Sequence, residues 1–444
     1  MKRLLALFSN RTVFICPQMK ISACALMLVF LCNVAKAQVP SPALNGYWQD
    51  WDDASSPYIQ IDQIDSRYNV VTVAFAVPVG GTLYQIGYTP VTGTNAAFIS
   101  EIQTLQSQGK KVIVSIGGET DPVSIANIAQ RNIFISSMDN ILNTFGFDGV
   151  DIDFEGSSLS ISGGTIAAPV DSPVVNLIAG LKQIMKDYRV SHNKKLLLTL
   201  APETADVQGG MSAYAGIWGS YLPVISALHD SIDILQVQLY NTGSMYGIDG
   251  NIYTEGTADF IVAETEACIQ GFSTSGGTFV GLPASKVAVG LPACSGAAGG
   301  GFTDTATVGK AMRYLIGTGP KPGSYTLHQT GGYPTLAGMM TWSINWDKVC
   351  TNYDYAANFQ RIFSSLTSSS IIYTFTGSGN WSVASNWSGN IIPPSTLPSG
   401  SQIIINPSGT NECVLNVTET ISAGATITVA TGKKFRIPGD LHLQ

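Results

Sequence analysis

Eight short apolar runs, rich in valine, leucine and isoleucine, recur along the first three quarters of the chain. They span residues 46–51, 70–77, 111–118, 148–155, 195–203, 232–241, 286–292 and 338–347. Amphipathic segments with apolar residues at helical spacing lie between many of them, at 98–108, 133–145, 174–188, 258–269 and 308–316. Apolar strands that alternate with helices are typical of a parallel sheet covered by helices. Eight such units predict an α/β fold, the (β/α)8 TIM barrel.

The predicted barrel tells where functional residues should lie. A doubly wound open sheet is the alternative, but no glycine-rich phosphate fingerprint follows the first run. In a (β/α)8 barrel the active site is built at the carboxyl ends of the strands. Those ends carry Trp48, Ser115, Gly117, Gly118, Asp153, Glu155, Glu203, Gln238, Tyr240, Asn241 and Trp342. This mixture of carboxylates, amides, a phenol and indoles is suited to sugars, because aromatic faces stack on C–H faces while polar groups bind hydroxyls and amides.

The fourth apolar run carries an unusual set of acidic residues. Between 150 and 155, apolar residues alternate with Asp151, Asp153 and Glu155. Period two is the pattern of a strand and puts these three carboxylates on one face, with Glu155 at the carboxyl end. Asp148 lies off that face, so we expect it to form hydrogen bonds at the start of the strand. Carboxylates held together in an interior repel one another and shift their pKa values, and proteins keep them mostly for chemistry.

Two other interpretations of the acidic run are weaker. A calcium loop would fit residues 151–156, but its twelfth position is Ser162, where a bidentate glutamate is needed. A solvated edge strand would tolerate the acids, but the eight-unit pattern surrounds this run with buried strands. Catalysis is therefore the preferred interpretation.

The amino-terminal 37 residues have the pattern of a secretory signal. Lys20 precedes an apolar run at 21–34, and residues 35–37 form a small-x-small cleavage pattern. The stretch before Lys20 is long for the first part of a signal, so we expect Met19 as an alternative start to Met1. Removing residues 1–37 leaves 18 basic against 30 acidic residues, a net charge of −12. That charge argues against nucleic acid as a partner. We expect a secreted protein, monomeric and without a membrane anchor after cleavage, that acts on a neutral substrate.

The remaining cysteines and the histidines do not suggest a metal site. Cys268, Cys294, Cys350 and Cys413 are widely spaced and include no C-x-x-C pair. The histidines at 192, 229, 328 and 442 are equally scattered. We therefore expect neither metal nor cofactor. Some of the cysteines can pair in an oxidising compartment, but their connectivity stays open.

Composition changes after residue 366. A serine- and threonine-rich linker leads into residues 371–444, where short alternating runs predict a small all-β module. We thus divide the chain into a signal at 1–37, a catalytic barrel at 38–366, and a linker with an accessory module at 367–444. Trp381 and Trp387 occur in two Asn-Trp-Ser repeats. They either bind carbohydrate or form the core of the module, and both interpretations stay open.

Together these motifs resemble a known family. The pattern of acids at 148, 151, 153 and 155 is similar to the signature of glycoside hydrolase family 18. The runs Ser-Ile-Gly-Gly at 115–118 and Gln-Leu-Tyr-Asn at 238–241, and Trp342, resemble that family's third, sixth and eighth strands. The stretches 200–204, 214–218 and 340–347 resemble bacterial chitinases of the chitinase D type. The resemblance covers residues 45–366.

The resemblance implies a retaining, substrate-assisted mechanism. Glu155 would be the general acid and later the base, while the substrate's own N-acetyl carbonyl attacks C1. Asp153 would orient the acetamido N–H, and Asp151 would share a proton with Asp153. Tyr240 would hydrogen-bond the acetamido carbonyl, and Trp342 would stack under the reacting sugar.

Several other residues are expected around this centre. Gln238 and Asn241 should bind sugar at the barrel mouth. Ser115 and Trp48 are placed among the substrate contacts, although Ser115 is also compatible with supporting the residues that touch substrate. Trp48, like Trp51 and Trp346, is equally compatible with core packing. Gly117 and Gly118 are structural, and Glu203 either lines the cleft or caps a helix.

The implied activity is that of a secreted bacterial chitinase acting on chitin or N-acetylglucosamine oligosaccharides. The segment 292–338 leaves little room for the α+β insertion that deepens the cleft in many relatives, so we expect endo action. The alternative is an endo-β-N-acetylglucosaminidase that cuts the chitobiose core of N-glycans. A non-catalytic lectin or inhibitor on the same barrel is disfavoured, because such proteins usually lose one of the acids that are present here.

Overall fold

The structure is a computed structural model that describes residues 39–368, 372–398, 400–422 and 424–443. The expected signal at 1–37 lies outside the described residues. None of the described helices combines the length and the apolar character that a bilayer crossing requires. The described chain forms a barrel and a separate set of β-strands, and each is presented on its own.

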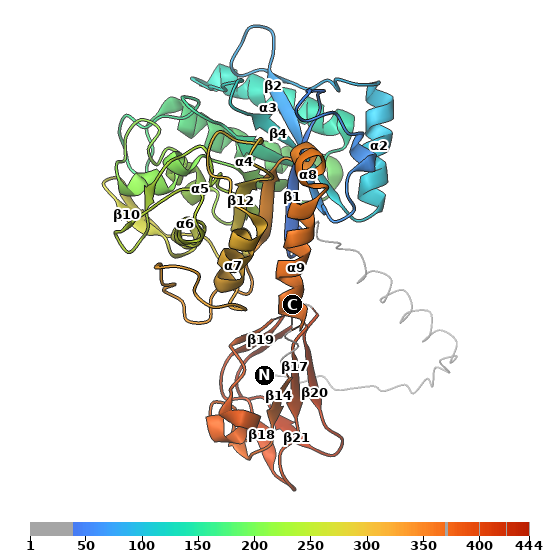
Figure 1. Cartoon of the computed structure of the whole chain (residues 1–444), viewed down its shortest axis with the longest axis vertical. Helices are drawn as coiled ribbons and strands as arrows, with labels where there is room; N and C mark the ends of the chain where they lie inside the picture. Colours follow the sequence, from blue (N-terminus) through green and yellow to red (C-terminus); the bar gives the residue numbers. More distant parts are fainter. Residues whose placement is uncertain (1–38, 369–371, 399, 423, 444) are drawn as a thin grey trace, which may run out of the picture. The chain divides into compact units, whose positions relative to one another are not determined.

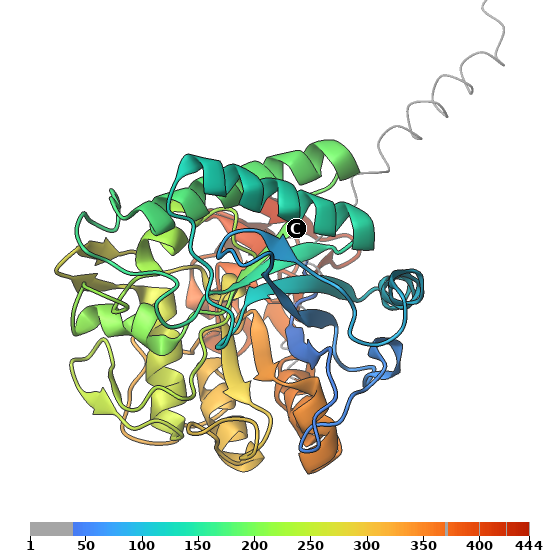
Figure 2. The ribbon, with the colours of Figure 1, turned by 90° about the horizontal axis from the view of Figure 1, so that it is seen from above.

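Eight parallel strands form the barrel, as the sequence predicted (Figures 1 and 2). They are β1 (Ala43–Gln49), β2 (Val70–Pro78), β4 (Lys111–Gly117), β5 (Gly149–Asp153), β6 (Leu197–Leu200), β7 (Ile234–Leu235), β12 (Ala288–Pro292) and β13 (Gly338–Trp342). Their order around the barrel is β12-β13-β1-β2-β4-β5-β6-β7. Parallel bridges from Leu235 to Val287 and from Gln238 to Gly290 join the two ends of this order and close the barrel.

Helices cover the outside of the strands (Figure 2). They are α2 (Asn95–Ser107), α3 (Ile128–Phe145), α4 (Ser172–His192), α5 (Leu222–Ala227), α6 (Ala258–Gln270), α7 (Thr305–Leu315), α8 (Ile344–Thr351) and α9 (Asp354–Ser368). Polar caps set several of their starts. Thr94 accepts a hydrogen bond from the amide of Ala97, and Asn127 accepts one from that of Gln130. α2 and α3 therefore begin before the first apolar residue of each periodic pattern.

Short elements decorate the barrel. Single-turn 3-10 helices are η1 (Ile61–Gln63), η2 (Thr204–Asp206), η3 (Gln208–Met211) and η4 (Ala284–Lys286). β3 (Ile86–Gly87) pairs antiparallel with β2. Two small hairpins, β8 (Met245–Tyr246) with β9 (Ile252–Tyr253) and β10 (Phe272–Thr274) with β11 (Gly277–Phe279), lie between β7 and β12 in the chain.

The sixth strand is much shorter than the predicted run at 232–241. Regular pairing is limited to β7, but the backbone beyond it still bonds to both neighbours. The amide of Gln238 donates to the carbonyl of Pro202 at 2.9 Å, and the amide of Leu239 donates to that of Gly290 at 3.0 Å. The chain thus continues along the barrel wall and carries Gln238, Tyr240 and Asn241 to its carboxyl end.

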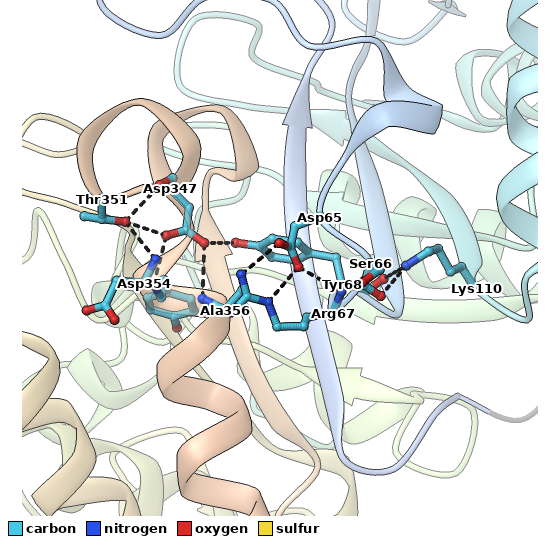
Figure 3. A network of polar contacts seen from close by, with 10 residues as sticks. Asp65, Ser66, Arg67, Tyr68, Lys110, Asp347, Thr351, Asp354 and Ala356 are labelled. Carbon is cyan, nitrogen blue, oxygen red and sulfur yellow. Dashed lines mark hydrogen bonds and ion pairs between the residues drawn. The ribbon is translucent and has the colours of Figure 1, made fainter.

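A buried carboxylate, Asp347 in the first turn of α8, ties two distant segments together (Figure 3). It accepts hydrogen bonds from the hydroxyls of Tyr68 at 2.6 Å and Thr351 at 2.8 Å. The amides of Tyr355 and Ala356 add two more, at 2.9 and 3.1 Å. Because Tyr68 lies two residues before β2, this cluster links the β1–β2 connection to the α8–α9 turn.

One disulfide joins Cys294 to Cys350, with a Cα–Cα separation of 6.3 Å. It connects the segment after β12 to α8. The other two described cysteines, Cys268 and Cys413, are free thiols and are buried.

The carboxyl-terminal strands form a small β-solenoid, consistent with the all-β prediction (Figure 1). Its strands are β14 (Ile372–Phe375), β15 (Gly379–Asn380), β16 (Thr396–Leu397), β17 (Gln402–Ile405), β18 (Glu412–Val414), β19 (Glu419–Ile421), β20 (Thr426–Val429), β21 (Lys434–Arg436) and β22 (Leu441–Leu443), with η5 (Ala384–Asn386) and η6 (Ser388–Asn390). Three parallel sheets, β14-β17-β20, β15-β18-β21 and β16-β19-β22, each take one strand from three successive turns of the chain.

The two tryptophans of the module belong to its core. Trp381 is 1% and Trp387 2% exposed, and their rings meet edge to face at 4.7 Å. The indole N–H of Trp387 donates to the carbonyl of Trp381 at 2.7 Å. Neither ring offers a face to a carbohydrate, so of the two interpretations the structure supports the core.

Candidate active site

Strand β5 places its acids as the alternation predicted. Asp151 and Asp153 are buried on the interior face, and Glu155 follows the end of the strand with its side chain half-buried. Asp148, one residue before β5, is off that face. Its Oδ2 accepts hydrogen bonds from the amide of Val112 at 3.1 Å and from Gln106 at 3.0 Å. Asp148 therefore anchors the start of the strand, as expected.

Asp151 is a buried carboxylate of the site that four side chains hold in place. Its carboxylate accepts hydrogen bonds from the hydroxyls of Tyr47 at 2.5 Å and Ser115 at 2.7 Å, from the amide of Gln236 at 3.2 Å, and from Thr199 Oγ1. Burial raises the pKa of Asp151, and these four hydrogen bonds counter the rise. Ser115 is completely buried beneath the cleft, so it positions Asp151, and its expected place among the substrate contacts is corrected.

Asp153, Glu155 and Gln238 form one connected unit. Gln238 Nε2 donates to Asp153 Oδ1 at 2.8 Å and to Glu155 Oε1 at 2.9 Å. The two carboxyl groups also share a hydrogen bond. Burial raises the pKa of Asp153 well above its ordinary value, and the nearby Glu155 charge adds to the rise. The Asp153 carboxyl is therefore hydrogen-bonded to Glu155 in this structure. From the sequence we expected Asp153 to share a proton with Asp151.

An open cleft of about 920 Å³ lies over these carboxyls at the carboxyl ends of the strands. Trp342 forms part of its lining and stacks on Phe75, with ring centroids 5.7 Å apart and an angle of 17°. Trp51 continues the aromatic surface, 6.2 Å from Trp342. Tyr240, whose pKa burial raises well above its ordinary value, also lines the cleft. These residues give the cleft aromatic faces and a phenol hydroxyl.

The remaining wall of the cleft is a glycine- and alanine-rich loop. Residues 296–299 line it, directly after the disulfide at Cys294. Asn241, with a positive φ of 55°, accepts a hydrogen bond from the amide of Gly300 at 3.0 Å. Asn241 thus lines the cleft and also holds this loop.

The glycine pair expected to be structural permits a close approach of two strands. Gly117 has a φ of 110°, and a Cβ there would meet the carbonyl oxygen of Asp153 at 2.4 Å. The amide of Gly118 donates to that same carbonyl at 2.8 Å. The pair therefore lets β4 pack directly against the end of β5.

Trp48 is not part of the cleft, which corrects its place among the substrate contacts. It is fully buried on the outer face of β1, where it stacks on Phe98 of α2. Its indole N–H donates to the carbonyl of Ile59 at 2.7 Å. The register of β1 explains this, because adjacent residues alternate in direction and Tyr47 is the one that faces inward.

Some residues of the site were not singled out from the sequence. Tyr47, Thr199 and Gln236 all hold Asp151, and Asp50 lines the cleft. Thr199 and Gln236 could have been found from the sequence, because each is a polar residue within a mostly apolar run. Glu203, left open between two roles, lines the cleft and accepts a hydrogen bond from the amide of Gly156 at 3.0 Å. Among the described residues, no group of three or more histidine, cysteine or acidic side chains is arranged to hold a metal ion.

A (β/α)8 barrel with hydrogen-bonded carboxyl groups beneath an aromatic-lined cleft is an arrangement typical of glycoside hydrolases. The sequence model of the family described as Glycosyl hydrolases family 18 matches residues 43–375, three quarters of the chain. The protein therefore belongs to glycoside hydrolase family 18.

Relatives and a solved structure agree with this assignment. Chitinase Chi52 of Paenibacillus xylanexedens is 43% identical over 337 residues, which cover 74% of this chain and 64% of the relative. Chitinase D of Niallia circulans is 44% identical over 315 residues, covering 70% and 59%. This chain thus spans about three fifths of the length of these relatives. A family GH18 chitinase structure from Chromobacterium violaceum aligns with a TM-score of 0.64 and 36% identity, covering 74% of this chain and 85% of that one.

Proposed function

We propose that this protein is a secreted, endo-acting chitinase that cleaves β-1,4-linked N-acetylglucosamine polymers with retention. The observation that carries the proposal is the unit in which Gln238 bridges Asp153 and Glu155. It lies in a cleft whose lining includes Trp342 and Tyr240. The similarity to proteins named Chitinase Chi52 and Chitinase D supports chitin as the substrate.

The geometry supports a substrate-assisted route. Burial raises the pKa of Glu155, which favours its protonated form. Glu155 gives its proton to the glycosidic oxygen as the bond from C1 to that oxygen breaks. The acetamido carbonyl oxygen of the same sugar attacks C1 and forms an oxazolinium ion. Water then gives its proton to Glu155 and attacks C1, which regenerates the acetamido group and the acid with overall retention.

Asp153 serves the acetamido group in this proposal. It rotates from Glu155 to accept the acetamido N–H and stabilises the positive charge of the oxazolinium ion. Asp151, held by its four donors, stays fixed in position beneath it. The Tyr240 hydroxyl would orient the acetamido carbonyl, Trp342 would stack on the sugar ring, and Gln238 and Asn241 would add polar contacts.

The absence of an inserted domain supports endo action. Between β12 and β13 the described chain carries the cleft loop and one regular helix, α7, but no strand. A cleft without a high wall on that side admits an internal segment of a polymer. The amino-terminal signal pattern supports secretion.

Replacing the proposed acid tests the assignment. We expect Glu155→Gln to lower kcat on N-acetylglucosamine hexamer at least about a hundredfold, because the amide cannot give a proton to the leaving oxygen. Glu101→Gln on α2 is the matched control and should retain wild-type kcat. Wild-type activity in Glu155→Gln would contradict the proposal.

One further assay separates the alternatives. The hexamer and a high-mannose glycoprotein, incubated side by side with the enzyme, distinguish a chitinase from an endo-β-N-acetylglucosaminidase. We expect rapid cleavage of the hexamer and little release of glycan. Binding of chitin without any cleavage would instead identify a lectin.

A further inference from the structure

Charge in the cleft is entirely of one sign. Six acidic residues line it: Asp50, Glu119, Asp121, Asp153, Glu155 and Glu203. Among the described residues that line the cleft, none is lysine, arginine or histidine. The proposed mechanism uses Asp153 and Glu155 at the end of β5, but it gives no task to Asp50, Glu119 and Asp121. We call these three the acidic side of the cleft, and they follow β1 and β4, which flank β2 in the barrel.

Asp50 lacks the partners that a buried carboxylate needs. Only 2% of the residue is exposed. Its Oδ2 accepts hydrogen bonds from the Tyr88 hydroxyl at 2.6 Å and from the amide of Val91 at 3.2 Å. Its Oδ1, equally buried, has no partner. An ionised carboxylate with an unsatisfied oxygen is unfavourable in an interior, so a ligand that supplies a donor here is favoured.

The surroundings of Asp50 favour a positively charged donor over a neutral one. Burial raises the pKa of Asp50 to about 6, so the group is charged at neutral pH. Tyr88, which bonds to Asp50, and the stacked pair Trp51 and Phe75 also line the cleft and offer aromatic faces. Glu119 and Asp121 add negative charge at the rim, where low-dielectric walls focus the field. A neutral hydroxyl gains little from that field, whereas a cation beside Asp50 gains from its carboxylate, from the overall negative charge of the cleft and from the rings.

We infer that the acidic side of the cleft binds a glucosamine unit through its protonated 2-amino group, with Asp50 as the direct acceptor. This inference rests on the proposed chitinase function, because the sugar at Glu155 must keep its acetyl group to assist the reaction. The preferred substrate is therefore a partially deacetylated chitin, in which free amines occur at sugars other than the one that reacts.

The inference is tested by comparing two substrates at pH 7. The enzyme is given N-acetylglucosamine hexamer and a chitosan in which about half of the units are acetylated. The ratio of kcat/KM for chitosan to that for the hexamer is measured at low and at high salt. Because exposed charges are screened by salt, we expect the ratio to fall severalfold between 0.02 and 0.5 M NaCl.

Variants assign the effect to named carboxylates. Asp50→Asn keeps the shape and an acceptor for Tyr88 but removes the charge. We expect it to lower the ratio about three- to tenfold. Asp121→Asn, at the partly exposed rim, should lower the ratio less and carries little risk to folding. Asp230→Asn, at an exposed site away from the cleft, makes the same change in net charge and should leave the ratio unchanged.

The outcomes separate this inference from the function on which it rests. Equal ratios in wild type, Asp50→Asn and Asp121→Asn, with no effect of salt, would overturn the amine site while leaving chitinase activity intact. The same result would mean that Asp50 receives a neutral hydroxyl or a water molecule. Failure of the wild-type enzyme to cleave either substrate would overturn the chitinase assignment itself.

Discussion

Glu155 is surrounded by groups that act on its proton in opposite directions. Burial raises its pKa, the hydrogen bond from Gln238 lowers it, and the negative charge of Glu203 raises it. Glu203 also accepts a hydrogen bond from the amide of Gly156, so its carboxylate is held next to Glu155. A general acid is useful only while it keeps its proton, and a neighbouring carboxylate is one way to retain it.

We predict that Glu203→Gln shifts the alkaline limb of the kcat/KM profile to lower pH. The amide still accepts the hydrogen bond from Gly156, but it no longer carries the charge that disfavours ionisation of Glu155. A carboxylate in a partly solvated cleft contributes on the order of 1 kcal/mol, so the shift should be about half a pH unit to one unit. A pH series with N-acetylglucosamine hexamer measures it.

The control for this prediction is Glu101→Gln, which removes a charge outside the cleft. It should leave the alkaline limb in place. An identical limb in Glu203→Gln and wild type would mean that Glu203 does not tune the acid. A loss of kcat at every pH without a shift would assign to it only the positioning of the turn at Gly156.

At the scale of the elements, the existence of the strands was predictable and their ends were less so. All eight apolar runs are barrel strands, because burial on both faces leaves a clear signal. The acids of β5 alternate as expected. Trp48 was misplaced because a one-residue change of register moves a side chain to the other face, and sequence alone does not fix the register of β1. The partners of Asp151 come from four other segments and depend on tertiary packing.

The cleft loop is an element that the sequence could not place. It is rich in glycine and alanine and has no periodic pattern, yet residues 296–299 form a wall of the site. The structure fixes it through the Cys294–Cys350 disulfide and through Asn241. Gly296 packs so closely on Trp346 of α8 that a Cβ would meet the indole at 2.8 Å. The loop is therefore clamped to the helix that follows Trp342.

We predict that the double variant Cys294→Ser/Cys350→Ser weakens both stability and substrate binding. The disulfide closes a chain segment of 56 residues, and loss of such a crosslink typically costs about 2–4 kcal/mol. A looser loop should raise KM for the hexamer more than it lowers kcat, because the catalytic carboxyls lie on β5. Urea unfolding and steady-state kinetics measure the two effects.

The free cysteines provide the comparison for the disulfide. Cys268→Ala should leave KM unchanged, since that thiol is buried against Gln208 and lies outside the cleft lining. A KM in the double variant equal to that of wild type would show that Asn241 and Trp346 suffice to hold the loop.

Across the described residues of the molecule, buried carboxyl groups outnumber the buried cations that could pair with them. Burial raises the pKa of Asp50 to about 6 and that of Asp206 to about 8. In Asp206, Oδ1 accepts from Ser220 at 2.7 Å while Oδ2 is buried without a partner. Such groups keep their protons in the folded state at pH values where the unfolded chain has lost them. The protein therefore combines an acidic composition with an interior that prefers neutral carboxyls.

This imbalance predicts that stability falls as the pH rises from about 4 to 8. Between the unfolded pKa of Asp206, 3.8, and its folded pKa of about 8, the folded state holds one more proton than the unfolded chain. Each pH unit in that window then lowers the free energy of unfolding by about 1.4 kcal/mol for this group.

Asp206→Asn cannot ionise, so from pH 6 to pH 8 its free energy of unfolding should fall about 2–3 kcal/mol less than that of wild type. Urea unfolding at both values measures the difference, and Asp62→Asn on η1 is the control that makes the same change in charge. Parallel slopes in Asp206→Asn and wild type would mean that Asp206 is already ionised in the folded protein, with an unmapped donor at its Oδ2.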